Sequence, residues 1–128
     1  MSIRLHFYRD PGLTQRLGRI DTVRVAGTGS RLVQHTFYVG TPLRGYRYAA
    51  VDDGAITLSV VANGASSPGA VLALSDDGFA GATSELDLPT MIQGGEEFAI
   101  PVHLKLDLAV VDLTGLAIAT NDLIEWIV

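Results

Sequence analysis

The sequence predicts an all-β protein, an antiparallel β-sandwich of immunoglobulin-like type with a jelly roll as the alternative. Apolar residues alternate with polar ones in several short runs, which is the period of a β-strand. Gly, Pro and Asp clusters separate these runs, and none of them has a convincing helical pattern. About eight or nine short strands at this spacing are typical of a sandwich or barrel. The chain contains no cysteine, so the disulfide of antibody domains is absent.

The 128 residues fit a single domain spanning 1–128. Hydrophobic residues make up 48% of the chain, which is enough for a substantial core. Charged residues make up 18%, below the roughly 25% that is typical of soluble proteins. Such a composition suggests that a partner covers part of the exterior. A compact domain with a Ser/Thr/Gly surface explains it equally well.

The N-terminal part is predicted to begin with a strand over residues 3–8, which ends at the Asp-Pro-Gly turn of residues 10–12. Residues 13–19 are too short and glycine-interrupted for a helix and are expected to form a surface loop or one helical turn. A second strand is predicted over residues 20–26.

Residues 31–62 are predicted to form the centre of the domain, because they have a pattern of three strands separated by two turns. The first strand ends at the Gly-Thr-Pro turn of residues 40–42. The second strand covers residues 46–51 and ends at an Asp-Asp-Gly turn. Residues 55–62 form the third strand, and aromatic and β-branched residues fill all three.

After a small-residue loop at 63–69, short strands are predicted at 71–75 and 86–88. The Asp-Asp-Gly sequence of residues 76–78 is a hairpin turn signal, and residues 93–96 form another turn.

The clearest alternation in the chain runs over residues 98–106. Pro101 within it favours an edge position or a bulge. Residues 107–120 are interpreted as two short strands with a bend at 114–115. The last strand, 121–128, places Ile124, Trp126 and Val128 on one face.

The motifs argue against an enzyme. The chain has no GxSxG motif and no P-loop. Glu96 and Glu97 are adjacent, and neighbouring residues of a strand point to opposite faces, so the two carboxylates are not expected to share a site. No cofactor is expected.

Metal sites have little support. His6, His35 and His103 lie within predicted strands and lack HxH or HxxxH spacing, so ordinary strand histidines explain them better than zinc. The two Asp-Asp-Gly turns lack the carboxylate spacing of a calcium loop, although calcium binding there stays open.

The charge is divided unevenly along the chain. Residues 1–50 carry eight basic and two acidic residues, 8 − 2 = +6, whereas residues 51–128 carry one basic and twelve acidic residues, 1 − 12 = −11. With a net charge of −5 and no Lys/Arg cluster, nucleic-acid binding is not expected. The two halves neutralise each other within one sandwich, or they mediate head-to-tail contacts between copies. The first alternative is favoured.

No membrane span is expected, because no window approaches roughly 18 continuous apolar residues. The N-terminal apolar run is too short and too charged for a signal peptide. The chain is therefore expected to act without crossing a membrane.

Two runs of the sequence carry a resemblance to a known class of proteins. They are HTFYVGTPLRGYRYAAVDDGAITLSV, at residues 35–60, and LALSDDGFAGATSELDLPTMIQGGEEFAIPVHLKLD further along. The chain resembles small structural proteins of tailed bacteriophages and prophages, in which an "FYVGNP"-like turn is followed by an "ITLS"-type strand and an "LxLPxxxxGGExxxIPVHL"-like segment. The matching positions are residues 37–42, 56–59 and 86–104, and the likeness covers roughly residues 31–106. The matching patterns are core and turn patterns, so no functional residue is transferred.

The resemblance implies a non-enzymatic virion component, made in the host cytoplasm. It would be a capsid decoration (cement) protein or a tail or neck protein, and its partners would be itself and other virion proteins. A homo-oligomer or assembly subunit is expected. The candidate contact residues are Arg16, Arg19, Arg44 and Trp126, the last because the C-terminus is strongly apolar. The alternative is a stand-alone module that binds a receptor or glycan through its loops.

Overall fold

The computed structural model describes residues 4–17, 32–62, 65–66, 70–74, 84–107 and 116–128. In these ranges the chain forms eleven β-strands and one short 3-10 helix, with no α-helix, and every strand pair is antiparallel. The protein is therefore an all-β antiparallel sandwich, as the sequence predicts. The immunoglobulin-like assignment, with a jelly roll as the alternative, stays a prediction.

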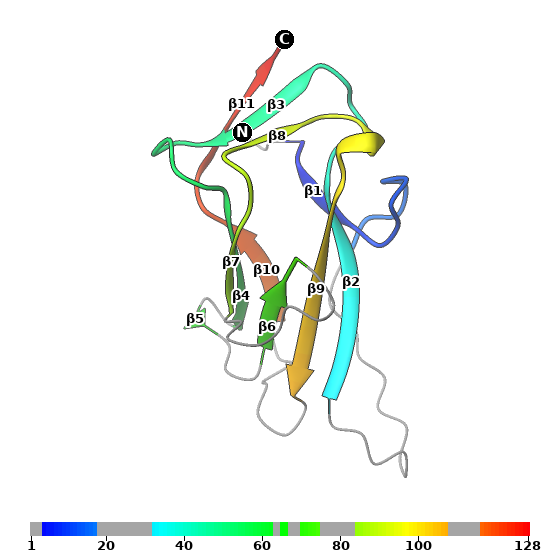
Figure 1. Cartoon of the computed structure of the whole chain (residues 1–128), viewed down its shortest axis with the longest axis vertical. Helices are drawn as coiled ribbons and strands as arrows, with labels where there is room; N and C mark the ends of the chain where they lie inside the picture. Colours follow the sequence, from blue (N-terminus) through cyan, green and yellow to red (C-terminus); the bar gives the residue numbers. More distant parts are fainter. Residues whose placement is uncertain (1–3, 18–31, 63–64, 67–69, 75–83, 108–115) are drawn as a thin grey trace.

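One layer of the sandwich is the sheet that we call the β2–β9 sheet, with strand order β1-β2-β9-β6. Its strands are β1 (His6–Tyr8), β2 (Leu32–Gly40), β9 (Ile100–Asp107) and β6 (Ala70–Ala73). Strands β2 and β9 pair over eight positions, from Leu32 opposite Asp107 to Val39 opposite Ile100. This long ladder forms the spine of the elongated molecule (Figure 1).

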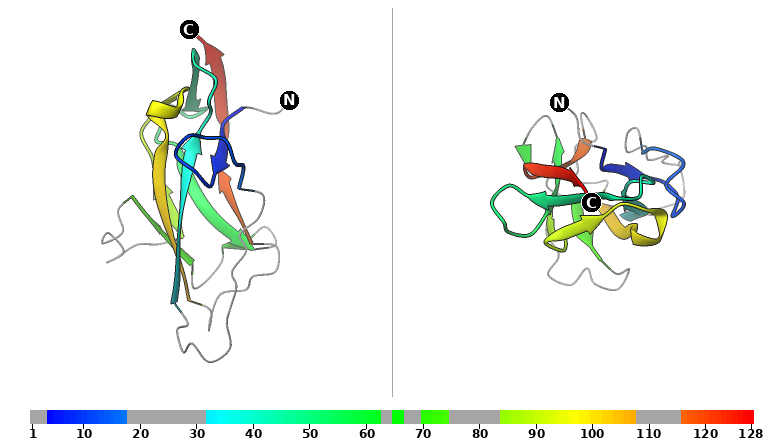
Figure 2. Two further views of the ribbon diagram at one scale, coloured as in Figure 1. Left: turned by 90° about the vertical axis from the view of Figure 1, so that its right-hand side faces the viewer. Right: turned by 90° about the horizontal axis from the view of Figure 1, so that it is seen from above.

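The other two sheets are named after their central strands. The β4 sheet consists of β10 (Leu116–Thr120), β4 (Thr57–Ala62), β5 (Ala65–Ser66) and β7 (Glu85–Asp87). The β3 sheet consists of β11 (Leu123–Ile127), β3 (Tyr46–Ala50) and β8 (Met91–Gln93), and the 3-10 helix η1 (Glu96–Phe98) follows β8. The β3 sheet lies at one end of the molecule, where β11, β3 and β8 run side by side (Figures 1 and 2).

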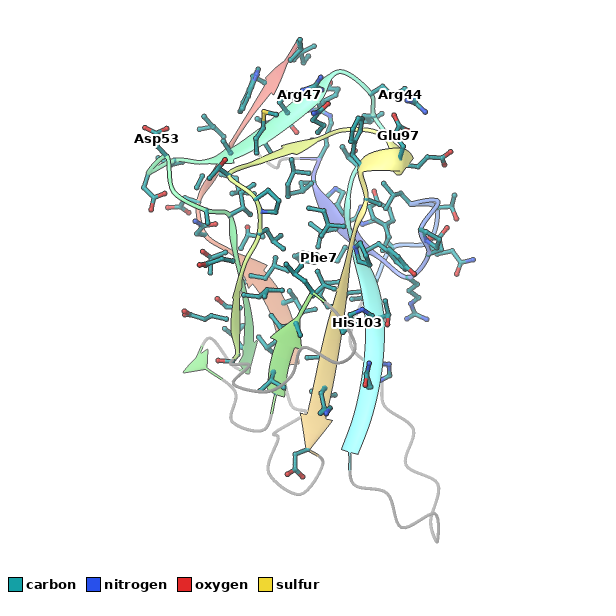
Figure 3. All side chains as sticks on the ribbon, in the orientation of Figure 1. Phe7, Arg44, Arg47, Asp53, Glu97 and His103 are labelled. Carbon is teal, nitrogen blue, oxygen red and sulfur yellow. The ribbon has the colours of Figure 1, made fainter. Side chains whose placement is uncertain are left out.

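The core lies between the β2–β9 sheet and the β4 sheet. The period-2 alternation of the strands decides which side chains enter it, because every second residue points inward. Phe37 of β2, Leu104 of β9 and Leu58 of β4 are almost fully buried in one hydrophobic cluster. Phe7 packs edge-on against Phe37 with ring centroids 5.8 Å apart, which attaches β1 to this cluster (Figure 3).

The β3 sheet continues the β4 sheet around a corner, since β3 leads into β4, β7 into β8 and β10 into β11. Backbone hydrogen bonds cross this corner, with Leu88 N donating to Ile56 O over 2.7 Å. The side chain of Asn121 clamps it. Its Oδ1 accepts from Thr57 N at 3.0 Å, and its Nδ2 donates to Ala55 O at 3.1 Å. The β3 sheet is therefore held at a fixed orientation to the core.

Most predicted strands in the described part are confirmed, and the differences have local causes. The predicted loop 63–69 includes the two-residue strand β5, and the turn prediction at 93–96 missed β8, which begins two residues earlier. Residues 96–98 form η1, so the long alternating strand begins at Ile100 and the prediction that the two glutamates lie on a strand was wrong. The predicted strand at 20–26, the turn at 76–78 and the bend at 114–115 lie outside the described residues.

Pro101 shows how a central strand tolerates proline. Strand β9 lies between β2 and β6, so the predicted edge position is wrong for the strand as a whole. Pro101 pairs with Tyr38 of β2, but β6 pairs only with residues 103–106. At Pro101 the described strands therefore provide a neighbour on one side only, and the missing N–H leaves the ladder intact.

Replacing Asn121 with alanine tests the corner clamp. Asn121→Ala leaves the Thr57 N–H and the Ala55 C=O without their side-chain partners, and we expect the free energy of unfolding to fall by about 1–3 kcal/mol. Chemical denaturation measures it. The neighbouring Asp122→Ala is the matched control. The side chain of Asp122 is exposed, and its backbone carbonyl accepts a hydrogen bond from Val51 N, which the substitution preserves. Equal stability of the two variants would contradict the clamp.

Candidate interaction surface

The outer face of the β3 sheet is built from two rows of paired residues. The strand register aligns Ile124 with Ala49 and Met91 in one row. In the second row Trp126 is aligned with Arg47 and Gln93. Residues that pair directly across antiparallel strands share a face, so the two rows form one continuous surface.

This surface is apolar and exposed. The exposed fractions are 47% for Ile124, 43% for Met91 and 38% for Trp126, and Val51 and Val128 extend the same alternation as exposed residues. Arg47 is the charged side chain of the two rows, and its guanidinium also donates to the carbonyl of Tyr46 at 2.9 Å. A large apolar side chain on each outer strand with arginine between them is an unusual exterior for a small soluble domain.

The inner face of the same sheet holds a polar latch, which we define as Arg4, Tyr48 and Glu125. Strand β11 places Glu125 opposite Tyr48 of β3. Tyr48 Oη donates to Glu125 Oε2 at 2.8 Å, and the backbone N–H of Arg4 donates to the same oxygen at 2.8 Å. Arg4 Nη1 binds the other carboxylate oxygen at 2.8 Å. The latch therefore ties the N-terminal segment to β11.

The latch fixes the protonation of its members. Burial of the Tyr48 phenol, with its hydrogen bond to Glu125, raises the pKa of Tyr48 far above its ordinary value, so the hydroxyl stays a donor. Burial alone would raise the pKa of Glu125, but the hydrogen bonds from Arg4 and Tyr48 and the Arg4 charge outweigh it. The pKa of Glu125 is therefore lowered. The Arg4 guanidinium also lies over the Tyr46 ring, 5.3 Å from its centroid.

The loop before β3 is shaped by a close approach to two glycines. Gly95 N donates to Thr41 O at 2.8 Å, and Gly94 N donates to Tyr46 O at 2.8 Å. Gly94 also approaches the carbonyl of Leu43 so closely that a Cβ atom would overlap it. Gly95 has a φ of 118°, a backbone conformation that would be strained for any residue with a side chain. The two glycines thus position the loop that carries Arg44.

Two of the four predicted contact residues lie at this end of the molecule. Arg44 lies beside Gly45, whose carbonyl accepts from Val128 N at 2.7 Å, and Trp126 belongs to the outer face. Arg44 forms an ion pair with Glu97, and because both side chains are well exposed it adds little stability (Figure 3).

The other two predicted residues are not part of this surface. Arg16 lies in the loop after β1, where it forms an isolated bridge with Tyr8. Burial, together with the nearby Arg16 charge, lowers the pKa of His6. Arg19 lies outside the described residues.

Two ion pairs between described residues bear on the uneven charge of the sequence. Arg4 with Glu125 and Arg44 with Glu97 each join a basic residue of the first half to an acidic residue of the second half. Both agree with neutralisation within one sandwich, the alternative that the sequence favoured.

The structure also locates the other candidate ligands. The predicted strand histidines do lie on strands, and His103 Nδ1 lies 2.9 Å from Thr36 Oγ1. In the described ranges no three metal-binding side chains are close enough to share an ion. Asp52 Oδ1 accepts from Gly54 N at 2.9 Å, as in a hairpin turn, and the second Asp-Asp-Gly turn lies outside the description. No helix of the described part is long and apolar enough to cross a membrane.

Sequence reasoning missed Glu125, Asn121 and Met91. Glu125 carried a signal, because the alternation that puts Ile124 and Trp126 on one face puts a carboxylate on the other, which must then find a donor. Asn121 was the first residue of the predicted last strand, and the hydrogen bonds of its side-chain amide depend on residues 55 and 57, which are distant in the sequence. Met91 was overlooked because β8 has only three residues.

Comparison with protein-family models, curated proteins and solved structures gives no match. The motif positions of the phage resemblance fall on the end of β2, the start of β4 and the segment from β7 to β9. The two glycines of the "GGE" part of the last motif are Gly94 and Gly95, which closely approach the loop that carries Arg44.

The latch predicts a defined dependence of stability on pH. Because folding lowers the pKa of Glu125, its contribution is fully present above the ordinary glutamate pKa of about 4.3 and is lost as pH falls through the lower folded value. Glu125→Gln removes this contribution, so we expect it to be less stable than the native protein at pH 7. The difference should shrink below about pH 4, as thermal unfolding at several pH values would measure. A difference that grows in acid would contradict the latch.

Gly94→Ala tests the close approach. The new methyl group overlaps the Leu43 carbonyl, so the loop must move, at a cost of about 1–3 kcal/mol in the free energy of unfolding. Gly12→Ala is the matched control, because its Cβ would meet Asp10 Oδ2 at an ordinary 3.4 Å. Denaturant titration compares the two, and equal losses would contradict this account.

Proposed function

We propose that the chain is a non-enzymatic structural protein of a tailed-phage particle. The form that we favour is a capsid decoration protein, which stabilises the assembled shell through contacts with itself and with the major capsid protein. The observation that supports this role most directly is the exposed outer face of the β3 sheet. The resemblance of residues 31–106 to phage structural proteins gives the class of partner.

The surface has the residue types of a protein contact. Tryptophan and arginine dominate the binding energy of many interfaces, and Trp126 and Arg47 are adjacent in one row. A protein that binds only the assembled shell shifts the equilibrium toward it by mass action. The β3 sheet is rigidly connected to the core at the Asn121 corner, so little conformational freedom is lost on docking.

A tail or neck protein is the nearest alternative within this role, because it would use the same kind of contact with a different partner. In either form the protein would reside in the virion after its synthesis in the host cytoplasm.

A glycan-binding module is the second candidate, and one observation favours it. The row Gln93, Arg47 and Trp126 places an amide, a guanidinium and an exposed aromatic ring together on one face. Such groups can stack on a sugar ring and bind its hydroxyl groups. The row lies on a sheet face, whereas the sequence predicts that a receptor or glycan would be bound by loops.

Met91→Lys tests the structural role. Met91 belongs to β8, on the far side of the face from β11, and a lysine there places a charge in the apolar contact. We expect at least a tenfold loss of affinity for empty capsids, measured by co-sedimentation of the full chain. Leu74→Lys is the matched control, because Leu74 is similarly exposed but follows β6 of the other layer.

Saturable capsid binding by the control and its loss in Met91→Lys would support the decoration role. A native protein that ignores capsids but binds tails would favour the tail or neck form. Binding to neither, with a positive glycan screen, would overturn the structural role and support the glycan module.

A further inference from the structure

Strand β11 has a described neighbouring strand on one edge only. In the described part of the chain it pairs with β3 alone. Val51 N donates to Asp122 O, and Val128 N donates to Gly45 O, so residues 122 and 128 are hydrogen-bonded to the β3 side. Hydrogen-bonded positions alternate along an antiparallel pair. The N–H and C=O groups of Leu123, Glu125 and Ile127 therefore point away from β3.

This edge has little protection against pairing. Natural sheets block their edges with lysine, proline, bulges or inward-pointing charges. In β11 the acidic residue is Glu125, and its carboxylate is already bound by Arg4 and Tyr48 on the inner face. The remaining residues, Leu123, Ile124, Trp126 and Ile127, are apolar, and three of them are exposed.

We propose that β11 pairs antiparallel with β11 of a second copy of this chain, about a two-fold axis at Glu125. A two-fold contact uses the same patch on both copies. If one residue of the first copy contacts a second residue of the other copy, the reverse contact is also formed. With the axis at Glu125, Leu123 lies opposite Ile127 of the second copy. Ile124 lies opposite Trp126 of the second copy. Each of these cross-strand pairs joins two apolar side chains.

The two neighbouring registers are less favourable. An axis at Ile124 places Leu123 opposite Glu125 of the second copy. An axis at Trp126 places Ile127 opposite Glu125 of the second copy. In either register the two-fold symmetry creates two contacts between a glutamate and an apolar side chain. A shift by a single residue would place the outward-facing backbone groups opposite residues of the second copy whose own N–H and C=O groups point back to β3, so the two strands could not form a ladder.

The charges at the proposed axis balance. The two Glu125 carboxylates would approach each other there, but each binds its own Arg4 at 2.8 Å. Two positive and two negative groups then surround the axis, so like-charge repulsion is offset. Pairing also joins the two outer faces into one six-stranded apolar surface. The inference deepens the proposed structural role and rests on it for its purpose, although its test is independent of capsids.

Cysteine cross-linking reads the register directly, because the native chain has no cysteine. In the proposed register residues 124 and 126 face each other as a non-hydrogen-bonded pair, with Cα atoms about 4.5 Å apart. That distance suits a disulfide. The double variant Ile124→Cys/Trp126→Cys should form a covalent dimer under mild oxidation. The single variants Ile124→Cys and Trp126→Cys are the matched controls, since their own copies would lie about 7–8 Å apart on the diagonal.

Light scattering of the native protein completes the test. We expect a mass twice the 13.6 kDa of the chain, and a shift to the monomer in Ile127→Pro, which removes an outward N–H without touching the β3 ladder. Ile127→Ala keeps that N–H and should remain dimeric. Efficient cross-linking of either single variant would overturn the register. A native monomer without cross-linking of the double variant would overturn the pairing. Dimers that ignore capsids would leave the pairing intact and overturn the proposed function instead.

Discussion

The corner at Asn121 is the constraint on which the surface chemistry of this protein depends. Its amide satisfies one donor and one acceptor of the β3-to-β4 segment, so the sheet turns at a defined place. Beyond the corner, the face of the β3 sheet that carries Tyr48 and Glu125 turns toward Arg4, and the other face is exposed to solvent. Without this turn, the alternation of β11 would have no fixed inside and outside.

The five residues of strand β11 determine both its inner and its outer face. Glu125 fits only beside the donors Arg4 and Tyr48, while Trp126 is left on the outer face. A slip of one residue would expose the carboxylate and drive the indole into a space filled by polar groups. The latch thus specifies the register of an edge strand that is otherwise almost uniformly apolar, because a slip would separate Glu125 from its two partners.

The sequence was most informative where alternation is long. Strands β2, β3, β4 and β9 follow from it because each has five or more residues and contributes to one core. Strands β5 and β8 are too short to show a period, and η1 includes Phe98, the first residue of the alternation over residues 98–106, so the strand begins later than the pattern does. Arg44 and Trp126 could be proposed from their places in the sequence, Arg44 because it follows the turn at residues 40–42 and Trp126 because the C-terminus is strongly apolar. Glu125 and Asn121 could not be assigned roles, because their partners lie 121 and about 64 residues away in the chain.

The span of the latch has a consequence for folding kinetics. Arg4 and Glu125 are separated by 121 residues, and β2 pairs with β9 across more than sixty. Non-local contacts require the closure of long loops before any stabilisation is gained, so such topologies fold in milliseconds to seconds. Arg4 precedes β1 of the β2–β9 sheet, and Glu125 lies on β11 of the β3 sheet. The contact between them therefore forms when these two sheets come together, which makes it a marker of the completed native state.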